Sequence, residues 1–408
     1  MKTGCAMDTL LLEWGTLLLR WVHIISSIAW IGSSFYFMHI DAALRPATNM
    51  PKGAYGEVWE VHGGGFYEVR KYLVAPDHLP QKLIWHKWES YFSWLSGFAL
   101  LGWIYYLKAD LFLIDPSVRP LSSAVAIFLS IASLIIGWLL YDFLCKSSVG
   151  QNQILLAVIG FSFVVLMAYF YQNIYSPRGA FIHTGALMAT IMSANVFLII
   201  IPNQTKIIAS LKAGQVADPR LGAIGKIRST HNNYLTLPVL FLMISNHYPM
   251  TYSSPYAYIL VGFILIAGAL IRVFFNLRHA GKGDHWWTVL VAALFLGASI
   301  AITLWSSSLA RDQLGLSPLS PRIEISQLTA PTSVVEIVIS RCSMCHAAEP
   351  VWDGISSAPK GIRLDTPHLI ALNKDEIMMQ TVLTRAMPPN NLTEMTGEER
   401  RIIKQWTR

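Results

Sequence analysis

The 408-residue sequence predicts an all-α protein, in which a bundle of membrane-spanning helices is followed by a small helical domain at the carboxyl end. Two observations support this fold class. Apolar residues make up 53% of the chain and charged residues only 13%, which is too apolar for a water-soluble protein. Long apolar runs recur between Trp14 and Trp305, and none follows Ser308. We therefore divide the chain into a membrane domain (1–308), a linker (309–331) and a C-terminal domain (332–408).

Eight apolar runs approach or exceed the length that crosses a hydrocarbon core of about 30 Å, which is roughly 20 residues of helix. The first run is too long for a cleaved signal peptide, and only Lys2 precedes it as a positive charge, so it should remain as a membrane helix. The expected spans are 14–40, 90–108, 121–143, 153–172, 182–202, 233–249, 256–276 and 286–308.

Basic residues in the connecting segments predict the orientation, because Lys and Arg accumulate in cytoplasmic loops. Segments 41–89 and 203–232 are rich in both. Lys146, Arg278 and Lys282 lie in connecting segments that the alternation of spans places on the same side of the membrane. The alternate loops hold few basic residues: Lys108, Arg119 and Arg178. Both termini should therefore face away from the cytoplasm. The net charge of +7 mostly reflects this bias, and no segment resembles a nucleic-acid-binding arm.

Cys342, Cys345 and His346 form a C-x-x-C-H motif, the signature of covalent haem c attachment. Two thiols one helical turn apart can add to the haem vinyl groups, and the adjacent imidazole can reach the iron. A zinc site would need about four ligands, and a redox dithiol would be expected in a βαβ context, which is absent. Cys5 and Cys145 lie far from the motif. Because haem c is attached outside the inner membrane of bacteria, the motif independently indicates a periplasmic C-terminus.

The residues around this motif are typical of a class I-like cytochrome c. Val334–Ile339 predicts a short helix before the motif, and Thr396 with Glu399 forms a capping box that opens a last helix. Met387 precedes two prolines that restrict the backbone, and it is our candidate for the second axial ligand of the haem iron. Other methionines remain alternatives: Met344, Met378, Met379 and Met395.

Histidines in or beside the membrane spans are candidates for function, since ionisable groups there are rarely accidental. Three are expected in the periplasmic half: His23, His183 and His247. Others should lie near the cytoplasmic boundary: His39, His86, His231, His279 and His285. Each could instead be a hydrogen-bonding residue at a helix end. Arg20, Asp142 and Arg272 lie where their side chains could extend to the interface, and we assign them no chemistry.

Two cytoplasmic segments carry side chains suited to a planar polar ligand. The first combines acid, base and guanidinium groups with three glycines that permit close approach of the backbone. The second has a histidine followed by two asparagines. A turn and a helix cap are the structural alternatives. The candidate site residues are Glu60, His62, Arg70, His231, Asn232 and Asn233.

Over essentially its whole length the chain resembles the bacterial membrane-bound urate oxidase (urate hydroxylase) family, in which a multi-span domain is fused to a cytochrome c. The resemblance rests on blocks in one order: Trp21–Phe37, His62–Tyr67, Lys87–Tyr91, His231–Pro238 running to Asn246–Pro249, and Cys342–His346. It implies oxidation of urate to 5-hydroxyisourate with oxygen from water. Electrons would pass to the fused haem c and on to a downstream cytochrome or terminal oxidase of the respiratory chain.

Urate is a flat monoanion, so its site needs a cation, amide hydrogen bonds, an aromatic face and a base. The cytoplasmic segments offer all of these. If urate binds there while haem c lies in the periplasm, electrons must cross about 30 Å of bilayer. That distance is too long for a single transfer, so we expect an intramembrane haem b, held by His23 together with His183 or His247.

Two other classes of function are compatible with these features. One is an electron-transfer module that connects quinol to a terminal oxidase without a substrate site of its own. The other is a different membrane haem oxidoreductase, for example one that acts on porphyrinogens. A simple uptake carrier fits least well, because a covalent haem would have no role in it.

Overall fold

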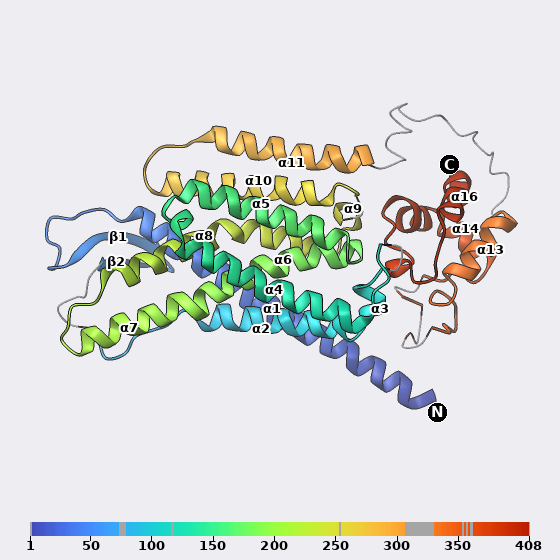
Figure 1. The fold of residues 1–408 in the computed structure, drawn as a ribbon, viewed down its shortest axis with the longest axis horizontal. Coiled ribbons are helices and arrows are strands. Elements are labelled where there is room, and N and C mark those ends of the chain that lie inside the picture. Colours follow the sequence, from blue (N-terminus) through green and yellow to red (C-terminus); the bar gives the residue numbers. More distant parts are fainter. Residues whose placement is uncertain are drawn as a thin grey trace.

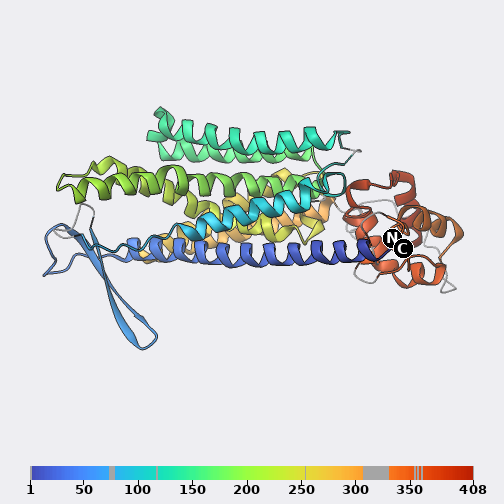
Figure 2. The same ribbon diagram turned by 90° about the horizontal axis from the view of Figure 1, so that it is seen from below.

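A computed structural model shows a long bundle of helices, with the C-terminal residues packed at one end of it (Figure 1). The N-terminus and the C-terminus lie at this same end in both views (Figures 1 and 2). The structure describes residues 2–72, 79–115, 118–252, 254–306, 330–352, 355, 358–359 and 362–407.

The bundle consists of long helices with short helical turns at its ends. One rod, formed by α6, η3 and α7, is continuous and extends beyond its neighbours (Figure 1). The elements are α1 (Lys2–Ala43), α2 (Trp88–Leu100), the π-helix η1 (Leu101–Tyr106), α3 (Ala109–Phe112), α4 (Ser123–Lys146), the 3-10 helix η2 (Ser148–Gln151), α5 (Gln153–Gln172), α6 (Pro177–Ala194), the π-helix η3 (Asn195–Ile200), α7 (Ile201–Lys212), α8 (Pro219–Ser245), α9 (Pro249–Tyr252), α10 (Ala257–His279) and α11 (Trp286–Ser306).

In the part of the chain that the structure describes, six helices are long and apolar enough to cross a membrane, which is compatible with a multi-pass membrane protein. They are Trp14–Ala43, Ser123–Lys146, Gln153–Gln172, Pro177–Lys212, Ala257–His279 and Trp286–Ser306. The expected spans 90–108 and 233–249 are not among them. The first is divided between α2 and η1, and the second lies in α8, whose central residues are polar. Both nevertheless pack within the bundle, α2 against α1 and α8 against α6 and α10.

The connections between helices lie alternately at the two ends of the bundle, as the expected topology requires. The short helices α3 and α9 lie at the end that contacts the C-terminal residues (Figure 1). The hairpin, the connection between α7 and α8 and the connection between α10 and α11 lie toward the opposite end (Figure 1). The loops that the charge pattern assigned to one side therefore do lie together.

The prediction of an all-α fold is wrong in one place, because residues of the first basic segment form an antiparallel hairpin of β1 (Ala54–His62) and β2 (Gly65–Tyr72). Val61 pairs with Phe66, so β-branched and aromatic side chains favour the strands. Gly63 and Gly64 have φ values of +59° and +83°, which glycine adopts most readily. The glycine run therefore makes the hairpin turn, and the hairpin projects sideways from the bundle end (Figure 2).

Small residues bring the central helices close together. A Cβ atom added at Gly268 of α10 would lie 2.7 Å from Cδ of Pro238 in α8, and one at Gly137 of α4 would lie 2.3 Å from Leu187 of α6. Small residues at helix crossings allow the close backbone approach on which packing in lipid depends. The contact between α8 and α10 brings together two helices that both carry buried polar side chains.

The C-terminal residues have a hydrophobic core of their own, which includes Val338, Ile370, Ile403 and Trp406. The two predicted helices are confirmed, as is the capping box: the Thr396 amide donates to Glu399 at 2.6 Å, and the Glu399 amide donates back at 3.2 Å. Most of the expected linker lies outside the described residues. The elements are α13 (Thr332–Arg341), α14 (Pro367–Leu372), α15 (Lys374–Ile377), the π-helix η5 (Met378–Leu383), the 3-10 helix η6 (Pro389–Asn391) and α16 (Gly397–Thr407).

Candidate functional site

Helix α8 carries a row of polar side chains into the centre of the bundle. The helix begins at Pro219, where the Asp218 side chain accepts a hydrogen bond as N-cap. The two asparagines therefore lie within the helix, and the alternative of a helix cap at these residues is wrong. Because consecutive residues are about 100° apart around a helix, Asn232 and Asn233 face different neighbours. Asn232 contacts η3 and Asn233 contacts α10.

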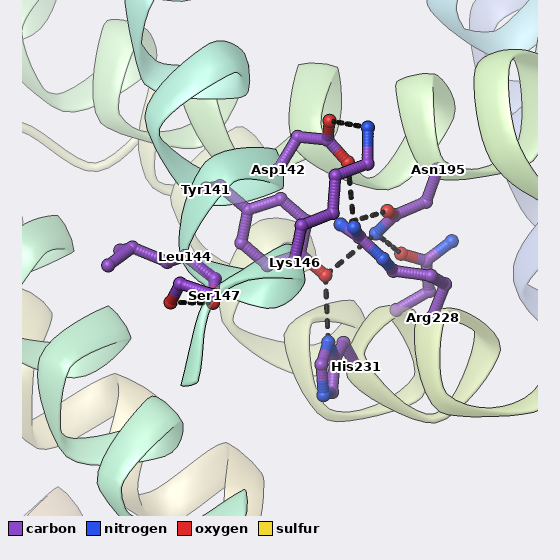
Figure 3. A network of polar contacts seen from close by, with 9 residues as sticks. Tyr141, Asp142, Leu144, Lys146, Ser147, Asn195, Arg228 and His231 are labelled. Atoms are coloured by element: carbon purple, nitrogen blue, oxygen red, sulfur yellow. Dashed lines mark hydrogen bonds and ion pairs between the residues drawn. The ribbon is translucent and has the colours of Figure 1, made fainter. Parts of the chain in front are cut away.

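The first polar network surrounds Arg228, whose side chain is 3% exposed (Figure 3). Its Nη2 donates to Asp142 of α4 at 2.7 Å, and its Nη1 donates to Asn195 of η3 at 3.2 Å. The guanidinium also lies 5.0 Å from the centre of the Tyr141 ring. Lys146 binds the second carboxylate oxygen of Asp142 at 2.6 Å. Arg228 is thus a buried cation with its own counter-ion.

A chain of neutral hydrogen bonds extends this network through His231. The Nδ1 atom of His231 lies 2.8 Å from the Tyr141 hydroxyl (Figure 3). Its Nε2 atom lies 3.1 Å from Oε1 of Gln153. Since an amide oxygen only accepts, His231 carries its proton on Nε2 and accepts at Nδ1 from Tyr141. Asn195 then donates to Tyr141 at 3.1 Å and to Asn232 at 2.9 Å. Both ring nitrogens of His231 are therefore engaged in fixed contacts.

The second polar network lies on the other side of α8, around Arg272 of α10. Arg272 is 5% exposed, so the interpretation that its side chain extends to the interface is wrong. Its Nε donates to Asn233 at 3.1 Å and its Nη2 to Asn276 at 3.2 Å. The ring of Phe35 in α1 covers the guanidinium at 4.1 Å. Unlike Arg228, Arg272 forms no ion pair with any carboxylate among the residues described.

Two stacked histidines lie on the same helix faces as this second network. The rings of His39 in α1 and His279 in α10 are 4.0 Å apart and nearly parallel. His39 follows Phe35 by one helical turn, and His279 follows Arg272 by two. This stack holds the ends of α1 and α10 together beside the second network. Both histidines belong to the group expected near the cytoplasmic boundary, and their sequence gives no sign that they stack.

The hairpin holds the other three candidate residues. Glu60 accepts a hydrogen bond from Tyr36 of α1 at 2.7 Å, and Arg70 pairs with Glu57 at 3.4 Å. His62 is exposed beside the turn. No hydrogen bond or ion pair between described residues joins these three to α8, and the hairpin points away from the helices (Figure 2). The structure therefore separates the six candidates into a hairpin group and an α8 group.

His183 lies at the centre of α6 and is fully buried. Its Nδ1 donates to the Gly179 carbonyl at 2.7 Å, and its Nε2 accepts from Ser130 at 2.7 Å. The Tyr106 hydroxyl shares the same serine at 2.7 Å, and the Tyr175 ring packs against the imidazole. Both nitrogens of His183 are occupied in this arrangement.

His23 differs from His183 in that one of its ring nitrogens has no hydrogen-bond partner within the described chain. Its Nδ1 lies 3.0 Å from the Ser93 carbonyl, which orients the ring and leaves Nε2 to face another group. Gly97 allows this contact, because a Cβ there would lie 2.9 Å from the imidazole. His247 lies in the turn between α8 and α9. Over the described ranges, no three His, Cys, Asp or Glu side chains cluster to hold a metal ion.

The residues of the C-x-x-C-H motif fit a c-type haem. Both thiols are free, with Cys342 buried and Cys345 half-buried. His346 donates from Nδ1 to the Ile362 carbonyl at 2.8 Å, which holds the ring, so that Nε2 is the nitrogen that would ligate a haem iron. An imidazole that ligates a metal typically donates its other N–H to such an acceptor.

The loop that carries Met387 is held at both sides. The Met387 amide donates to the Gln380 carbonyl at 2.9 Å, and its own carbonyl accepts from Arg400 at 3.1 Å. Of the alternative methionines, Met395 is buried in the hydrophobic core of this segment, and Met378 is buried and accepts a hydrogen bond from Thr407. Met387 is half-buried in its anchored loop, and its role as axial ligand stays a prediction.

The family model described as urate oxidase N-terminal matches residues 9–303. The match includes the helix bundle, the hairpin and both polar networks, and it ends before the C-terminal residues. No curated protein and no solved structure matches the chain.

Proposed function

Because the chain belongs to the urate oxidase N-terminal family, we propose that it is a membrane oxidoreductase that converts urate to 5-hydroxyisourate and passes the electrons to its own C-terminal haem c. The observation that carries the proposal is the family match across nearly the whole helix bundle. The C-x-x-C-H motif and the orientation of His346 support the second half of the proposal.

The reaction balances with water as the source of oxygen. Urate and one water give 5-hydroxyisourate, two protons and two electrons. The membrane domain must therefore bind an anion, accept protons and release electrons. A bound haem c would accept electrons one at a time, held through Cys342, Cys345, His346 and Met387.

We propose that the protein lies in the bacterial inner membrane with eight spans, including α2 with η1 and α8, and with both termini in the periplasm. The basic segments at the hairpin end of the bundle support this orientation. Arg228 lies in the first half of α8 and Arg272 in the last half of α10, the halves that join basic segments, whereas the C-terminal residues pack at the other end of the bundle (Figure 1). Electrons released at the networks would have to travel along most of the bundle.

An intramembrane haem b on this route is the second part of the proposal. His23 is the favoured ligand, because its Nδ1 is held by Ser93 and its Nε2 has no partner among the described residues. His183 or His247 would be the opposite ligand, and His183 could ligate iron through Nε2 only by giving up its contact with Ser130. Acidic acetone should extract haem b from the purified protein and leave the thioether-linked haem. His23→Ala should lose only the extractable haem, and a wild-type protein without extractable haem would exclude this carrier.

The decisive experiment is the anaerobic addition of urate to the purified full-length protein, with haem c reduction followed by absorbance. Urate should reduce the haem while 5-hydroxyisourate appears. An electron-transfer module would instead be reduced by a quinol and not by urate. A protein that acts on porphyrinogens would respond to neither, and either result would contradict the proposed function.

A further inference from the structure

Arg272 has hydrogen-bonding capacity that the described protein does not use. A guanidinium has five N–H donors. One on Nε binds Asn233 and one on Nη2 binds Asn276. The remaining three, which include both on Nη1, have no acceptor in the described part of the chain. Phe35 covers one face of the group at 4.1 Å, and the unused N–H groups point outward in the plane of the guanidinium.

Asn233 adds further unused donors at the same place. Its Oδ1 accepts from Arg272, while its Nδ2 is buried and has no hydrogen-bond partner. The residue as a whole is 0% exposed. Buried polar groups are almost always satisfied in folded proteins, so an unpaired amide beside an uncompensated guanidinium indicates a missing acceptor.

We propose that Arg272 and Asn233, with Asn276 and Phe35, form the site that binds the urate anion, at the junction of α1, α8 and α10. The inference rests on the proposed function and specifies its substrate site. The free Nη1–Nη2 edge of Arg272 presents two parallel N–H groups, which match adjacent acceptors on a planar anion. The Nδ2 group of Asn233 supplies a further donor to a ring nitrogen or carbonyl oxygen.

Arg272, and not Arg228 on the other side of α8, is the arginine available to an anion. Arg228 is equally buried, but Asp142 already neutralises its charge and both of its terminal nitrogens are occupied. An anion there would have to displace a carboxylate. At Arg272 an anion would supply the charge that the described protein does not provide.

The test uses the full-length protein in lipid nanodiscs, with urate binding measured by calorimetry. Asn233→Asp places a carboxylate of nearly the same shape against Arg272, and should weaken urate binding by about 30-fold or more. Because this change also neutralises a buried cation, it should not lower the unfolding temperature without urate. Arg272→Lys keeps the charge but loses the paired donors, and should weaken binding by about tenfold. Arg220→Gln, an exposed arginine at the start of α8, is the matched control and should bind urate normally.

The outcomes separate this inference from the proposed function. If the wild-type protein binds urate and Asn233→Asp and Arg272→Lys bind it equally well, the site lies elsewhere while the function stands. If the wild-type protein neither binds urate nor is reduced by it, the proposed function itself fails. Hypoxanthine, an uncharged purine, serves as the second probe of the wild-type protein. Binding of hypoxanthine as tight as that of urate would contradict recognition through the charge of Arg272.

Discussion

At the scale of single residues, the membrane domain contains two buried arginines with different surroundings. Arg228 has Asp142 as its counter-ion, and Arg272 has only amides and an aromatic ring. A buried charge that is paired and hydrogen-bonded stabilises a unique arrangement of helices, whereas one without a counter-ion is costly. The same residue type therefore has a structural role on one side of α8 and a proposed ligand-binding role on the other.

Removal of the counter-ion should reveal the structural role of Arg228. Asp142→Asn leaves a buried guanidinium uncompensated, and we expect it to lower the free energy of unfolding by about 3–5 kcal/mol. Asp218→Asn is the control, because its pair with Arg220 is exposed and should contribute at most about 1 kcal/mol. Thermal unfolding of both variants in the same detergent measures the difference. Equal unfolding temperatures would show that the Asp142–Arg228 pair is not structurally important.

The two haem-motif thiols should differ in reactivity before haem is attached. Burial raises the pKa of the Cys342 thiol to about 12, so almost no thiolate forms at pH 8. Burial also raises the pKa of Cys345, but this residue is half-buried and more accessible. In haem-free protein that lacks Cys5 and Cys145, iodoacetamide should label Cys345 first. Urea should remove the difference, and preferential labelling of Cys342 in the folded protein would contradict the burial described here.

At the scale of elements, the crossing of α8 and α10 determines the geometry of the second network. Asn233 and Arg272 come from these two helices, which meet closely at Pro238 and Gly268. A side chain at Gly268 would meet the rigid proline ring and not a flexible side chain. The distance between the two helices, and with it the contact between Asn233 and Arg272, thus depends on one glycine.

Gly268→Ala tests this dependence. The added Cβ would lie 2.7 Å from the Pro238 ring, so the helices must separate, and we expect a loss of about 1–3 kcal/mol in stability. Urate binding should weaken as well, because the donors of Arg272 and Asn233 would move apart. Gly160→Ala in α5 is the control: a Cβ there meets nothing within 4 Å, and alanine favours the helix. A Gly268→Ala protein as stable and active as Gly160→Ala would contradict the close packing.

At the scale of the whole molecule, the chain consists of a helix bundle that matches a known family and a C-terminal segment with its own core. The two meet where α3 packs against η6. We propose a domain boundary between Ser306, the last residue of α11, and Thr332, the first of α13. In the proposed function this boundary separates the substrate site from the electron acceptor.

Deletion of the chain from Pro331 onward should separate substrate binding from electron export. The truncated protein keeps every residue of the family match, so it should still bind urate. Turnover should be lost, because the residues that would hold haem c are absent. Calorimetry with urate, beside an activity assay of the full-length protein, gives both quantities. Failure of the folded truncated protein to bind urate would mean that the C-terminal segment contributes to the substrate site.

Local features of the chain predicted most of its architecture. Apolar runs predicted the six helices that could span the membrane, and the spacing of Thr396 and Glu399 predicted the start of α16. Such signals lie within a few residues of one another. The hairpin was missed because its glycines and charged residues are equally typical of an open loop. The start of α8 was placed too late because its polar residues interrupt the apolar pattern.

The sequence by itself determined the helical membrane bundle, the family resemblance and the haem-attachment motif, because each is encoded in neighbouring residues. Only the tertiary structure decided which polar residues are buried and which of them are paired. Arg228 meets Asp142 across 86 positions of the chain, and Arg272 meets Asn233 across 39. Helix packing creates these contacts, and the pattern of neighbouring residues in the sequence does not predict them. For this reason Arg272 had no assigned role in the sequence but becomes the proposed anion-binding residue in the fold.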